Sequence, residues 1–342
     1  MEKGLCELCN PKQWKTVSTS ELTSTGYPVY GANGVIGYYS NYNHEKETLL
    51  ITCRGATCGT LNICKPFSYI NGNAMALDDL SDEIDIRYLY FFLLSRGLSD
   101  TITGSAQPQI VRQSLKNVKI IYPNLDAQKH IVYVLGKADE LLSIRKQQLA
   151  KLDELVKARF VEMFGESEYP CNSLISLIIE GAGLSYGIVQ PGDDGTGDMG
   201  VLRPVDFADG KIKTDSIKYI DRSLGDGFKK TELNGNELLI TVRGTTGITA
   251  LTDSRFKGMN VTRGIAVIRY DEKKIDPIYL NEYLKMEESQ QYIKEHTRGA
   301  TLQQINLSDL RDLKVIVPPL LLQQAFSAFV ERVDQQKQTV QQ

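Results

Sequence analysis

The feature of this sequence that most constrains its fold is an internal duplication. Residues 49–57 (LLITCRGAT) return as residues 238–246 (LLITVRGTT). A second segment, residues 104–139, matches residues 299–334 without a gap at a constant offset of 195 (334 − 139). This period is far longer than the ~20–50 residues of solenoid repeats. The sequence therefore predicts two related globular modules, each followed by a helix.

The length and composition agree with two ordinary domains. A chain of 342 residues has room for about two domains. Hydrophobic residues make up 42% and charged residues 24%, as in globular proteins, so each module can bury a core. The chain contains neither an apolar run long enough to span a membrane nor the apolar core of a signal peptide near Met1. We expect a cytoplasmic protein without membrane contact.

The charges and the cysteines narrow the choice of partners. A formal net charge of −3 argues against a protein that coats nucleic acid indiscriminately, but it permits local basic patches. Cys6 and Cys9 have a metal-like spacing, yet a structural zinc site needs four ligands and the histidines are scattered. The six cysteines form no disulfide framework, and a chain of this size does not need one. We expect inert thiols and no metal site.

We predict a mixed α/β fold for both modules. The first module, residues 1–124, is expected to contain strands at 14–17, 27–30, 35–39, 48–52 and 118–121, a turn at 31–34 and a core helix at 86–94. The strand at 48–52 runs into Arg54 and Gly55, where glycine permits a sharp turn. The second module, residues 166–319, adds a stretch rich in Gly and Asp at residues 192–198.

Long helices are predicted after each module, at residues 125–165 and 320–342. Apolar residues of the first helix follow a heptad spacing, which is typical of a coiled coil: Ile131, Leu135, Ala138, Leu142, Leu149, Leu152, Val156 and Met163. The second helix carries Phe326, Val330 and Val333 at the offset of 195. We expect the two helices to pair with each other as a coiled coil. Since the second is shorter, part of the first is left for another protein or for a second copy of this chain.

Three short motifs occur in the same order in both halves. They are Leu-Leu-Ile-Thr-x-Arg-Gly-x-Thr, the turn Gly-x-x-x-x-Gln-Ile (from Gly104 and from Gly299), and the helix entry Pro-x-Leu-x-x-Gln (from Pro123 and from Pro318). Each motif alone is weak, but three in order, twice, are specific. Over nearly its whole length the chain resembles the specificity subunits of type I restriction–modification systems.

This resemblance implies a DNA-reading role. In that family, each module is a target recognition domain for one half of a split sequence in double-stranded DNA. The helices pair antiparallel, set the distance between the half-sites and dock methyltransferase subunits. It further implies that adenine methylation and cleavage belong to partner methyltransferase and restriction/translocase subunits, which hold S-adenosylmethionine, ATP and Mg, so that this chain is not an enzyme and needs no cofactor.

The helix length fits that role, although two features depart from the family. Ile131 to Met163 spans 33 residues, about 50 Å at ~1.5 Å per residue. Recognition modules meet the same face of DNA when half-sites lie about 34–36 Å apart. A rigid spacer of this length can hold two readers over one duplex, and because the two modules differ in their loops, we expect a bipartite and asymmetric target. The first module is smaller than the second, and the shorter final helix leaves self-association through the helices open.

The repeated arginines, Arg54 and Arg243, are the first candidate DNA contacts. Arginine can pair with guanine or with a phosphate. Because both modules carry it, phosphate contact is favoured over base reading, since modules that read different sequences should differ where they read. A structural ion pair is an equal alternative.

The glutamine-containing turns supply further candidates. Gln109 and Gln304 repeat, which favours a structural or phosphate-directed role. Gln107 and Gln303 are less constrained by the repeat and are better candidates for base reading. Arg112 and Arg298 flank the turns and could contact phosphates, with solvated surface charge as the favoured alternative.

Each module also has candidates of its own. The first has an aromatic and amide cluster, in which Tyr38 and Asn41 are the proposed contacts and sheet packing of the tyrosines is the alternative. At least one of Tyr38 and Tyr39 should point inward. The second has a basic stretch, from which Lys229 and Lys230 are proposed to follow the DNA backbone, with a merely soluble surface as the alternative.

No catalytic motif accompanies these residues. The chain lacks an Asn-Pro-Pro-Tyr-type motif, a Gly-x-Gly cofactor fingerprint after a strand and a Walker loop. Asp193 and Asp194 resemble a metal loop without the acidic spacing of known calcium motifs. Two other readings stay open: a tandem-module scaffold that binds proteins and not DNA, and a hydrolase that uses this loop.

Overall fold

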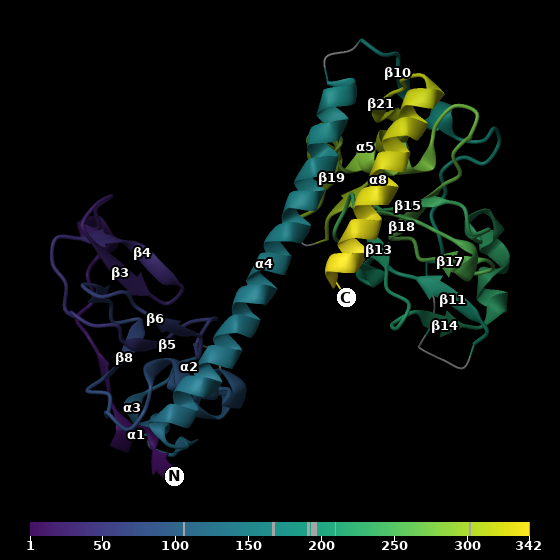
Figure 1. Ribbon diagram of the computed structural model, residues 1–342. Coiled ribbons are helices and arrows are strands. Elements are labelled where there is room, and N and C mark those ends of the chain that lie inside the picture. Colours follow the sequence, from purple (N-terminus) through teal and green to yellow (C-terminus); the bar gives the residue numbers. More distant parts are fainter. Residues whose placement is uncertain are drawn as a thin grey trace. The chain divides into compact units, whose positions relative to one another are not determined.

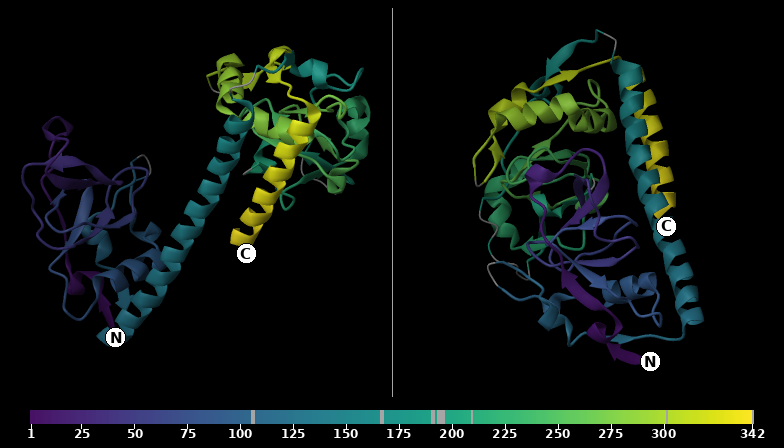
Figure 2. Two further views of the ribbon diagram at one scale, coloured as in Figure 1. Left: turned by 45° about the horizontal axis from the view of Figure 1, so that its top comes forward. Right: turned by 90° about the vertical axis from the view of Figure 1, so that its left-hand side faces the viewer.

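The computed structural model describes residues 1–104, 107–165, 168–189, 192, 197–208, 210–300 and 302–341 (Figures 1 and 2). The chain separates into two compact units, Met1–Ile144 (unit 1) and Arg145–Gln342 (unit 2). The division falls inside helix α4 (Leu125–Phe164), so each unit contains one half of it. The predicted mixed α/β class is confirmed.

Unit 1 contains three sheets and one core helix. Its four-stranded sheet has the order β2-β8-β5-β6, its three-stranded sheet the order β4-β3-β7, and β1 pairs with β9. The strands are β1 (Glu2–Gly4), β2 (Asn10–Gln13), β3 (Tyr27–Gly31), β4 (Gly34–Tyr39), β5 (Leu49–Thr52), β6 (Leu61–Ile63), β7 (Tyr69–Ile70), β8 (Ala74–Asp78) and β9 (Lys119–Ile121). The helices are α1 (Leu5–Leu8), η1 (Thr19–Glu21), α2 (Ile86–Arg96), η2 (Ser99–Thr101) and α3 (Arg112–Leu115).

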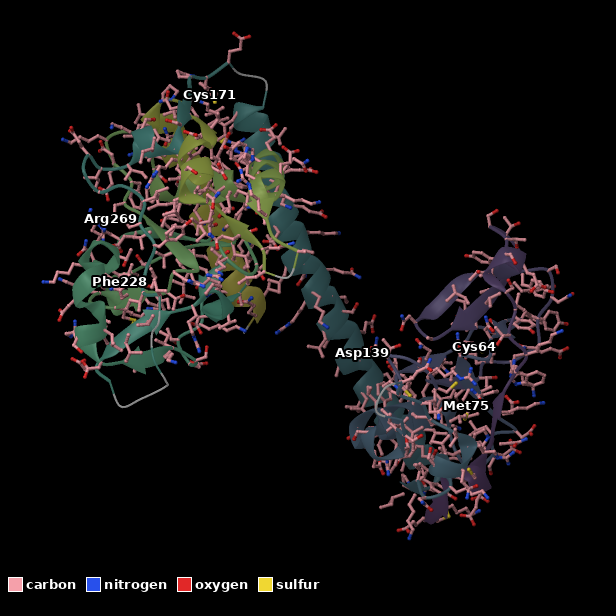
Figure 3. All side chains as sticks on the ribbon, turned by 180° about the vertical axis from the view of Figure 1, so that it is seen from behind. Cys64, Met75, Asp139, Cys171, Phe228 and Arg269 are labelled. Atoms are coloured by element: carbon pink, nitrogen blue, oxygen red, sulfur yellow. The ribbon has the colours of Figure 1, made fainter. Side chains whose placement is uncertain are left out.

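Strand β5 is buried on both faces, which explains its unbroken apolar run. Leu49 and Ile51 belong to the cluster that packs under α2, whereas Leu50 belongs to a smaller cluster on the other face. Met75 lies in the first cluster and Cys64 in the second (Figure 3). The alternation follows from the two-residue period of a strand, and it places the end of β5 between two packed layers.

Unit 2 has more elements than unit 1. Its sheets have the orders β16-β15-β18 and β14-β11-β17, with the pairs β10-β21, β12-β13 and β19-β20. The strands are β10 (Cys171–Ser173), β11 (Met199–Leu202), β12 (Phe207–Ala208), β13 (Lys211–Ile212), β14 (Lys218–Ile220), β15 (Leu238–Thr241), β16 (Thr249–Leu251), β17 (Asn260–Val261), β18 (Ile265–Ile268), β19 (Thr297–Arg298), β20 (Gln304–Ile305) and β21 (Lys314–Ile316). The helices are η3 (Leu174–Leu177), η4 (Pro204–Asp206), η5 (Arg222–Thr231), η6 (Ser254–Phe256), α5 (Pro277–Lys285), α6 (Glu287–His296), α7 (Leu307–Asp312) and α8 (Leu320–Gln341).

The duplication seen in the sequence is also present in the strand pairing. β1 pairs antiparallel with β9, and β10 pairs antiparallel with β21. β3 runs parallel to β7, and β11 runs parallel to β17. In each unit the central strand, β5 or β15, has an antiparallel neighbour on either side. The two units therefore share one frame.

A buried glutamine ties each long helix to its unit. Gln128 is fully buried; its Nε2 donates to the carbonyls of Glu83 and Pro123 at 2.9 Å each, and its Oε1 accepts from the Asp85 amide at 2.8 Å. Gln323, also fully buried, repeats two of these bonds, with the Asp276 amide at 2.8 Å and the Pro318 carbonyl at 2.7 Å.

Asp85 and Asp276 themselves cap α2 and α5 through two backbone amides each. The Pro-x-Leu-x-x-Gln motif is therefore a joint between core helix and long helix, because an unpaired buried amide or carbonyl is costly.

The predicted antiparallel coiled coil is present within unit 2, where α8 lies beside the carboxyl half of α4 (Figures 1 and 2). The rings of Phe160 and Phe326 are 5.5 Å apart, and Lys337 Nζ lies 2.8 Å from an Asp153 carboxylate oxygen. From the first contact to the second, the residue number falls along α4 (160 to 153) and rises along α8 (326 to 337), as antiparallel pairing requires. The predicted positions Val156, Val330 and Val333 are buried, and Leu149 and Leu152 are half-buried.

The half of α4 in unit 1 has an open apolar face. The seam positions Ile131, Leu135 and Leu142 are 36%, 40% and 58% exposed. Asp139, on the same stretch of α4, is exposed as well (Figure 3). The expectation that part of the heptad seam of the first long helix has no partner within this chain therefore agrees with the exposure of these described residues.

One predicted strand, at residues 14–17, is wrong. The strand lies earlier, at β2 (Asn10–Gln13). Trp14 instead donates its indole N–H to Asp78 at 3.0 Å, and the backbone of Val17 bonds to the side chain of Asn71 on both its N–H and its C=O. Hydrogen bonds to side chains thus take the place of the backbone hydrogen bonds that a strand at residues 14–17 would make. The other strands, the turn and the helix expected for the first module are present within a few residues.

Candidate nucleic-acid interface

The repeated motifs of unit 1 meet at the end of β5. Gly55, with φ +88°, turns the chain after Arg54, and its amide donates to the Pro108 carbonyl at 3.1 Å. The Ile110 amide donates to the Cys53 carbonyl at 3.1 Å. The Arg-Gly turn and the glutamine turn, which lie about fifty residues apart in the sequence, therefore form one hydrogen-bonded structure.

Unit 2 builds the same structure at the end of β15. Gly244, with φ +84°, donates to the Gln303 carbonyl at 2.9 Å, and the Ile305 amide donates to the Val242 carbonyl at 3.0 Å. A backbone bridge links Arg243 with Gln304, as another links Arg54 with Gln109. The sequence showed both motifs twice, but it carried no signal that they touch.

Neither of the two repeated arginines has an ion-pair partner among the described residues. Arg54 is exposed and Arg243 is half-buried. Among the residues that the structure describes, neither side chain makes a hydrogen bond or ion pair. Of the readings weighed above, the geometry favours an external partner over a structural ion pair.

The glutamine turns are exposed around this point. Gln107, Gln109 and Gln303 are exposed, and Gln304 is half-buried. Thr103 and Gln109 exchange backbone hydrogen bonds at 2.8 Å. Backbone groups thus hold Gln109 in place, and its exposed side-chain amide is accessible to a ligand. Side-chain amides of this kind can bind base edges or phosphates.

The flanking arginines both reach solvent. Arg112 is exposed on α3. Arg298 is exposed on β19, with its Nη2 3.7 Å from a carboxylate oxygen of Asp309. A single exposed contact at that distance holds an arginine weakly, so this side chain can move toward another anion.

A polar groove of about 600 Å³ lies beside the turns of unit 2. It is lined by Thr245, Thr246, Glu287, Gln290, Gln291, Ile293, Lys294, Thr297, Gly299 and Gln303. Residues of both repeated motifs thus share one concave surface with α6. Gln290 is tied down by bonds to the carbonyls of Gly247 and Leu284, at 3.0 and 2.6 Å, which fixes one wall.

The candidates peculiar to unit 1 lie on the β3–β4 hairpin and after it. Tyr38 is 39% exposed and Asn41 is exposed, whereas Tyr39 is half-buried in an edge-to-face contact with Tyr69, with ring centroids 5.5 Å apart. The Thr52 hydroxyl donates to the Ala32 carbonyl. This bond brings the hairpin turn to the strand that leads into Arg54, a contact the sequence did not reveal.

The candidates peculiar to unit 2, Lys229 and Lys230, are both exposed on η5. Arg269, labelled in Figure 3, donates to the carbonyls of Lys230 and Glu232 and so fixes the backbone of this segment. The two ammonium groups remain directed to solvent, where they can follow a phosphate backbone.

Two buried thiols of unit 1, Cys9 and Cys53, are poorly suited to nucleophilic catalysis. Burial raises the pKa of the Cys9 thiol to about 12 and raises that of Cys53, which suppresses the nucleophilic thiolate. In the described part of the chain no three His, Cys, Asp or Glu residues gather as a metal site would require. Asp193 and Asp194 lie outside the described residues. No described helix is long and apolar enough to cross a membrane.

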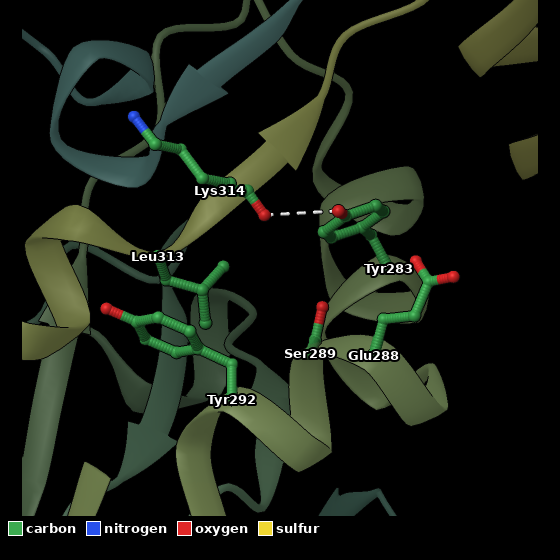
Figure 4. Close-up of a pocket in the computed structure, with 6 residues that line it drawn as sticks. All are labelled: Tyr283, Glu288, Ser289, Tyr292, Leu313 and Lys314. Atoms are coloured by element: carbon green, nitrogen blue, oxygen red, sulfur yellow. Dashed lines mark hydrogen bonds between the residues drawn. The ribbon is translucent and has the colours of Figure 1, made fainter. Parts of the chain in front are cut away.

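A second, smaller hollow of about 220 Å³ lies beside Tyr283 (Figure 4). The Tyr283 hydroxyl donates to the Lys314 carbonyl at 3.1 Å, and burial raises the pKa of this phenol. Its lining residues are Tyr283, Glu288, Ser289, Tyr292, Leu313 and Lys314. None of them belongs to the repeated motifs, so this hollow is separate from the candidate interface.

A family model described as "Type I restriction modification DNA specificity domain" matches residues 1–154 and 196–342. The chain is similar to the type I restriction enzyme EcoBI specificity subunit of Escherichia coli, with 27% identity over 152 residues that cover 44% of this chain. It is also similar to the EcoprrI specificity subunit of Escherichia coli, with 31% identity over 34% of this chain. These alignments span 31% and 28% of the two relatives.

A longer match is to a putative type I restriction enzyme specificity subunit of Haemophilus influenzae, 24% identical over 94% of this chain and 83% of the relative. Among solved structures, the fold matches the S subunit of a type I restriction–modification system from M. genitalium, with a TM-score of 0.63 and 16% identity over 100% of this chain and 91% of the other. A structure from a study of complex assembly of the type I R-M system matches with a TM-score of 0.52 and 14% identity, over 99% and 91% of the two chains.

Proposed function

This chain belongs to the family of type I restriction modification DNA specificity domains, and we propose that it is a sequence-specific DNA-binding specificity subunit. It would recognise a bipartite, asymmetric target and position methyltransferase and restriction subunits on it. The observation that carries this proposal is the pairing of the Arg-Gly turn with the glutamine turn, built by the same hydrogen bonds at the end of β5 and of β15.

The repeated part and the variable part of each unit suit different tasks. Arg54 and Arg243 occupy equivalent positions without internal partners among the described residues, which suits phosphate contact common to any sequence. Gln107 and Gln303 are exposed in the adjoining turns, and the surroundings of these turns differ between the units. Base edges are read by such differing side chains, so two halves of one target can have different sequences.

The helices supply the attachment to partners. The open face of α4 at Ile131, Leu135 and Leu142 is a run of exposed apolar side chains at heptad spacing. We propose that methyltransferase subunits dock here, with target recognition domains at residues 1–124 and 166–319. Chemistry, with S-adenosylmethionine, ATP and Mg, would belong to the partners in the cytoplasm.

The test is binding by the full chain together with a methyltransferase subunit from the same system. The pair should copurify, methylate one bipartite sequence in cellular DNA and shift a duplex of that sequence at a lower protein concentration than unrelated duplexes. Arg54→Ala with Arg243→Ala should weaken the shift on every sequence alike. Matched controls are Arg87→Ala and Arg255→Ala, exposed arginines that already pair with Glu47 and Asp253.

Two results would overturn the proposal. A complex that copurifies but shifts all duplexes equally, or none, would favour the protein-scaffold reading. A metal-dependent hydrolytic activity lost in Asp193→Ala with Asp194→Ala would favour the enzyme reading instead.

A further inference from the structure

Strands β3 and β11 occupy the same place in the two units. Beside the parallel neighbour of each strand, the Asn71 amide donates to the Tyr30 carbonyl and the Thr262 amide donates to the Leu202 carbonyl, both at 2.9 Å. The antiparallel neighbours are β4 and β14. In unit 1 the connection is the two-residue turn Ala32-Asn33, whereas in unit 2 it is the 15 residues 203–217 (217 − 202). This connection is where the shared frame diverges.

In both units the connection lies against the Arg-Gly turn. A Cβ on Gly264 would come within 2.7 Å of Pro204 Cγ and within 3.7 Å of the Arg243 carbonyl oxygen, so the three residues meet at one point. The Gly264 carbonyl also accepts from the Val242 amide at 2.7 Å. In unit 1 a different contact serves: the Thr52 hydroxyl, two residues before Arg54, donates to the Ala32 carbonyl of the connection.

The start of the unit 2 connection is rigid. Asp206 is fully buried; its carboxylate accepts from the Arg203 amide at 2.7 Å, from the Arg203 guanidinium at 3.0 Å and from the Ser216 hydroxyl at 3.1 Å. Arg203 Nη2 also donates to the Ser216 carbonyl at 2.6 Å, so the two ends of the connection are joined. Phe207 anchors the next residue in the core.

Val205 stands on this rigid turn with 74% of its surface exposed. Its neighbours in the chain, Pro204 and Asp206, are fixed by the Gly264 contact and by the carboxylate network. An exposed apolar side chain on a turn that hydrogen bonds hold in place can bind an apolar group of a ligand, because covering it removes apolar surface from water. The apolar feature that DNA offers in the major groove is the 5-methyl group of thymine.

We propose that residues 203–208, at the start of this connection, are a sequence-reading element of unit 2, and that Val205 reads the methyl group of one thymine in that unit's half-site. This inference rests on the proposed function and adds a residue and a base to it. Arg243 beside it would hold the phosphate, and the Asp206 network would fix the distance between the two contacts.

The experiment uses the full chain with its methyltransferase and the bipartite duplex found by methylome sequencing. Each thymine of both half-sites is replaced in turn by uracil, which removes only the 5-methyl group. For the unaltered chain, one replacement should weaken binding about fourfold, the equivalent of one buried methyl group. In Val205→Ala the same replacement should have no effect.

Ile179→Ala is the matched control, since Ile179 is another exposed branched side chain of unit 2, next to the far end of β18. It should leave every uracil penalty unchanged. If the complex methylates a bipartite sequence but no thymine shows a penalty that depends on Val205, the inference is overturned while the proposed function stands. If no specific sequence is methylated or bound, the proposed function itself fails.

Discussion

Unit 1 and unit 2 hold the same two motifs in the same strand frame, and they differ mainly in what is attached around them. The Arg-Gly turn, the glutamine turn and the buried glutamine make matching backbone bonds in both. By contrast, a two-residue turn in unit 1 stands where unit 2 has 15 residues. The shared bonds are internal to the fold, whereas the unit 2 connection combines buried anchors at Asp206 and Phe207 with exposed residues such as Val205. Selection for a new target sequence can therefore act on the exposed residues without disturbing the shared bonds.

The largest expected effect concerns the buried glutamines. Gln128→Leu removes the hydrogen-bond partner of three backbone groups, the Asp85 amide and the carbonyls of Glu83 and Pro123. Gln323→Leu removes the partner of two, the Asp276 amide and the Pro318 carbonyl. A buried polar group without a hydrogen-bond partner costs ~1–3 kcal/mol. We therefore expect the free energy of unfolding to fall by about 4 kcal/mol in Gln128→Leu and by about 3 kcal/mol in Gln323→Leu.

Denaturant unfolding can separate the two glutamine variants, because the single tryptophan, Trp14, belongs to unit 1. Its fluorescence transition should shift in Gln128→Leu and stay in place in Gln323→Leu. Amide exchange of α5 should report the second variant. Equal shifts of the tryptophan transition in both variants would show that the units do not unfold separately.

The next largest effect concerns the connection of residues 203–217, which unit 2 has in place of the two-residue turn of unit 1. Asp206→Ala removes a buried carboxylate that has no counterpart in the Ala32-Asn33 turn. We expect a loss of about 2 kcal/mol, in line with hydrogen bonds to a charged group, and faster amide exchange at residues 203–217. Asp253→Ala, at an exposed carboxylate that caps η6, is the control. Unchanged exchange at the connection would mean that the network does not hold it.

Parts of this comparison could be read from the sequence and parts could not. The strand before Arg54 and the heptad seam were predictable, because burial on both faces of a strand or along one helix stripe leaves a local pattern. The contact of Gly55 with Pro108 was not, since it joins segments whose separation carries no periodic signal. Gln128 was visible only as part of a motif. Val205 gave no signal at all, because an apolar residue after a strand is ordinarily core.

A smaller effect tests whether the repeated arginines do the same work. Arg54→Ala and Arg243→Ala should each weaken binding to the target duplex about tenfold and lower the slope of log affinity against log salt by about one. The loss should be equal on specific and unrelated duplexes, as expected for a phosphate contact. A loss confined to one base of the target would assign that arginine to base reading, and the two units would then differ at this position as well.

The smallest effect compares the two halves of α4. In unit 2, Lys337 bridges to Asp153 across the helix pair and to Asp334 on its own helix, whereas in unit 1 Lys137 pairs with Glu140 within α4 alone. A double-mutant cycle of Lys337→Met with Asp153→Asn should give a coupling of about 0.5 kcal/mol. The matched cycle of Lys137→Met with Glu140→Gln should give about 0.3 kcal/mol.

The coupling of Lys337 with Asp153 should also depend on pH. Burial lowers the pKa of Lys337, but hydrogen bonds to Asp153 and Asp334 outweigh it and raise the pKa above its ordinary value. A raised folded-state pKa means that the stabilisation is complete below the unfolded-state value of about 10.4 and is lost as the pH rises through the higher folded-state value. The unit 2 coupling, followed by denaturant midpoints from pH 8 to pH 11, should therefore hold through pH 10 and decline only above it. A coupling that already falls between pH 8 and pH 9 would mean that the interhelical bridge does not form, and that apolar packing alone pairs α8 with α4.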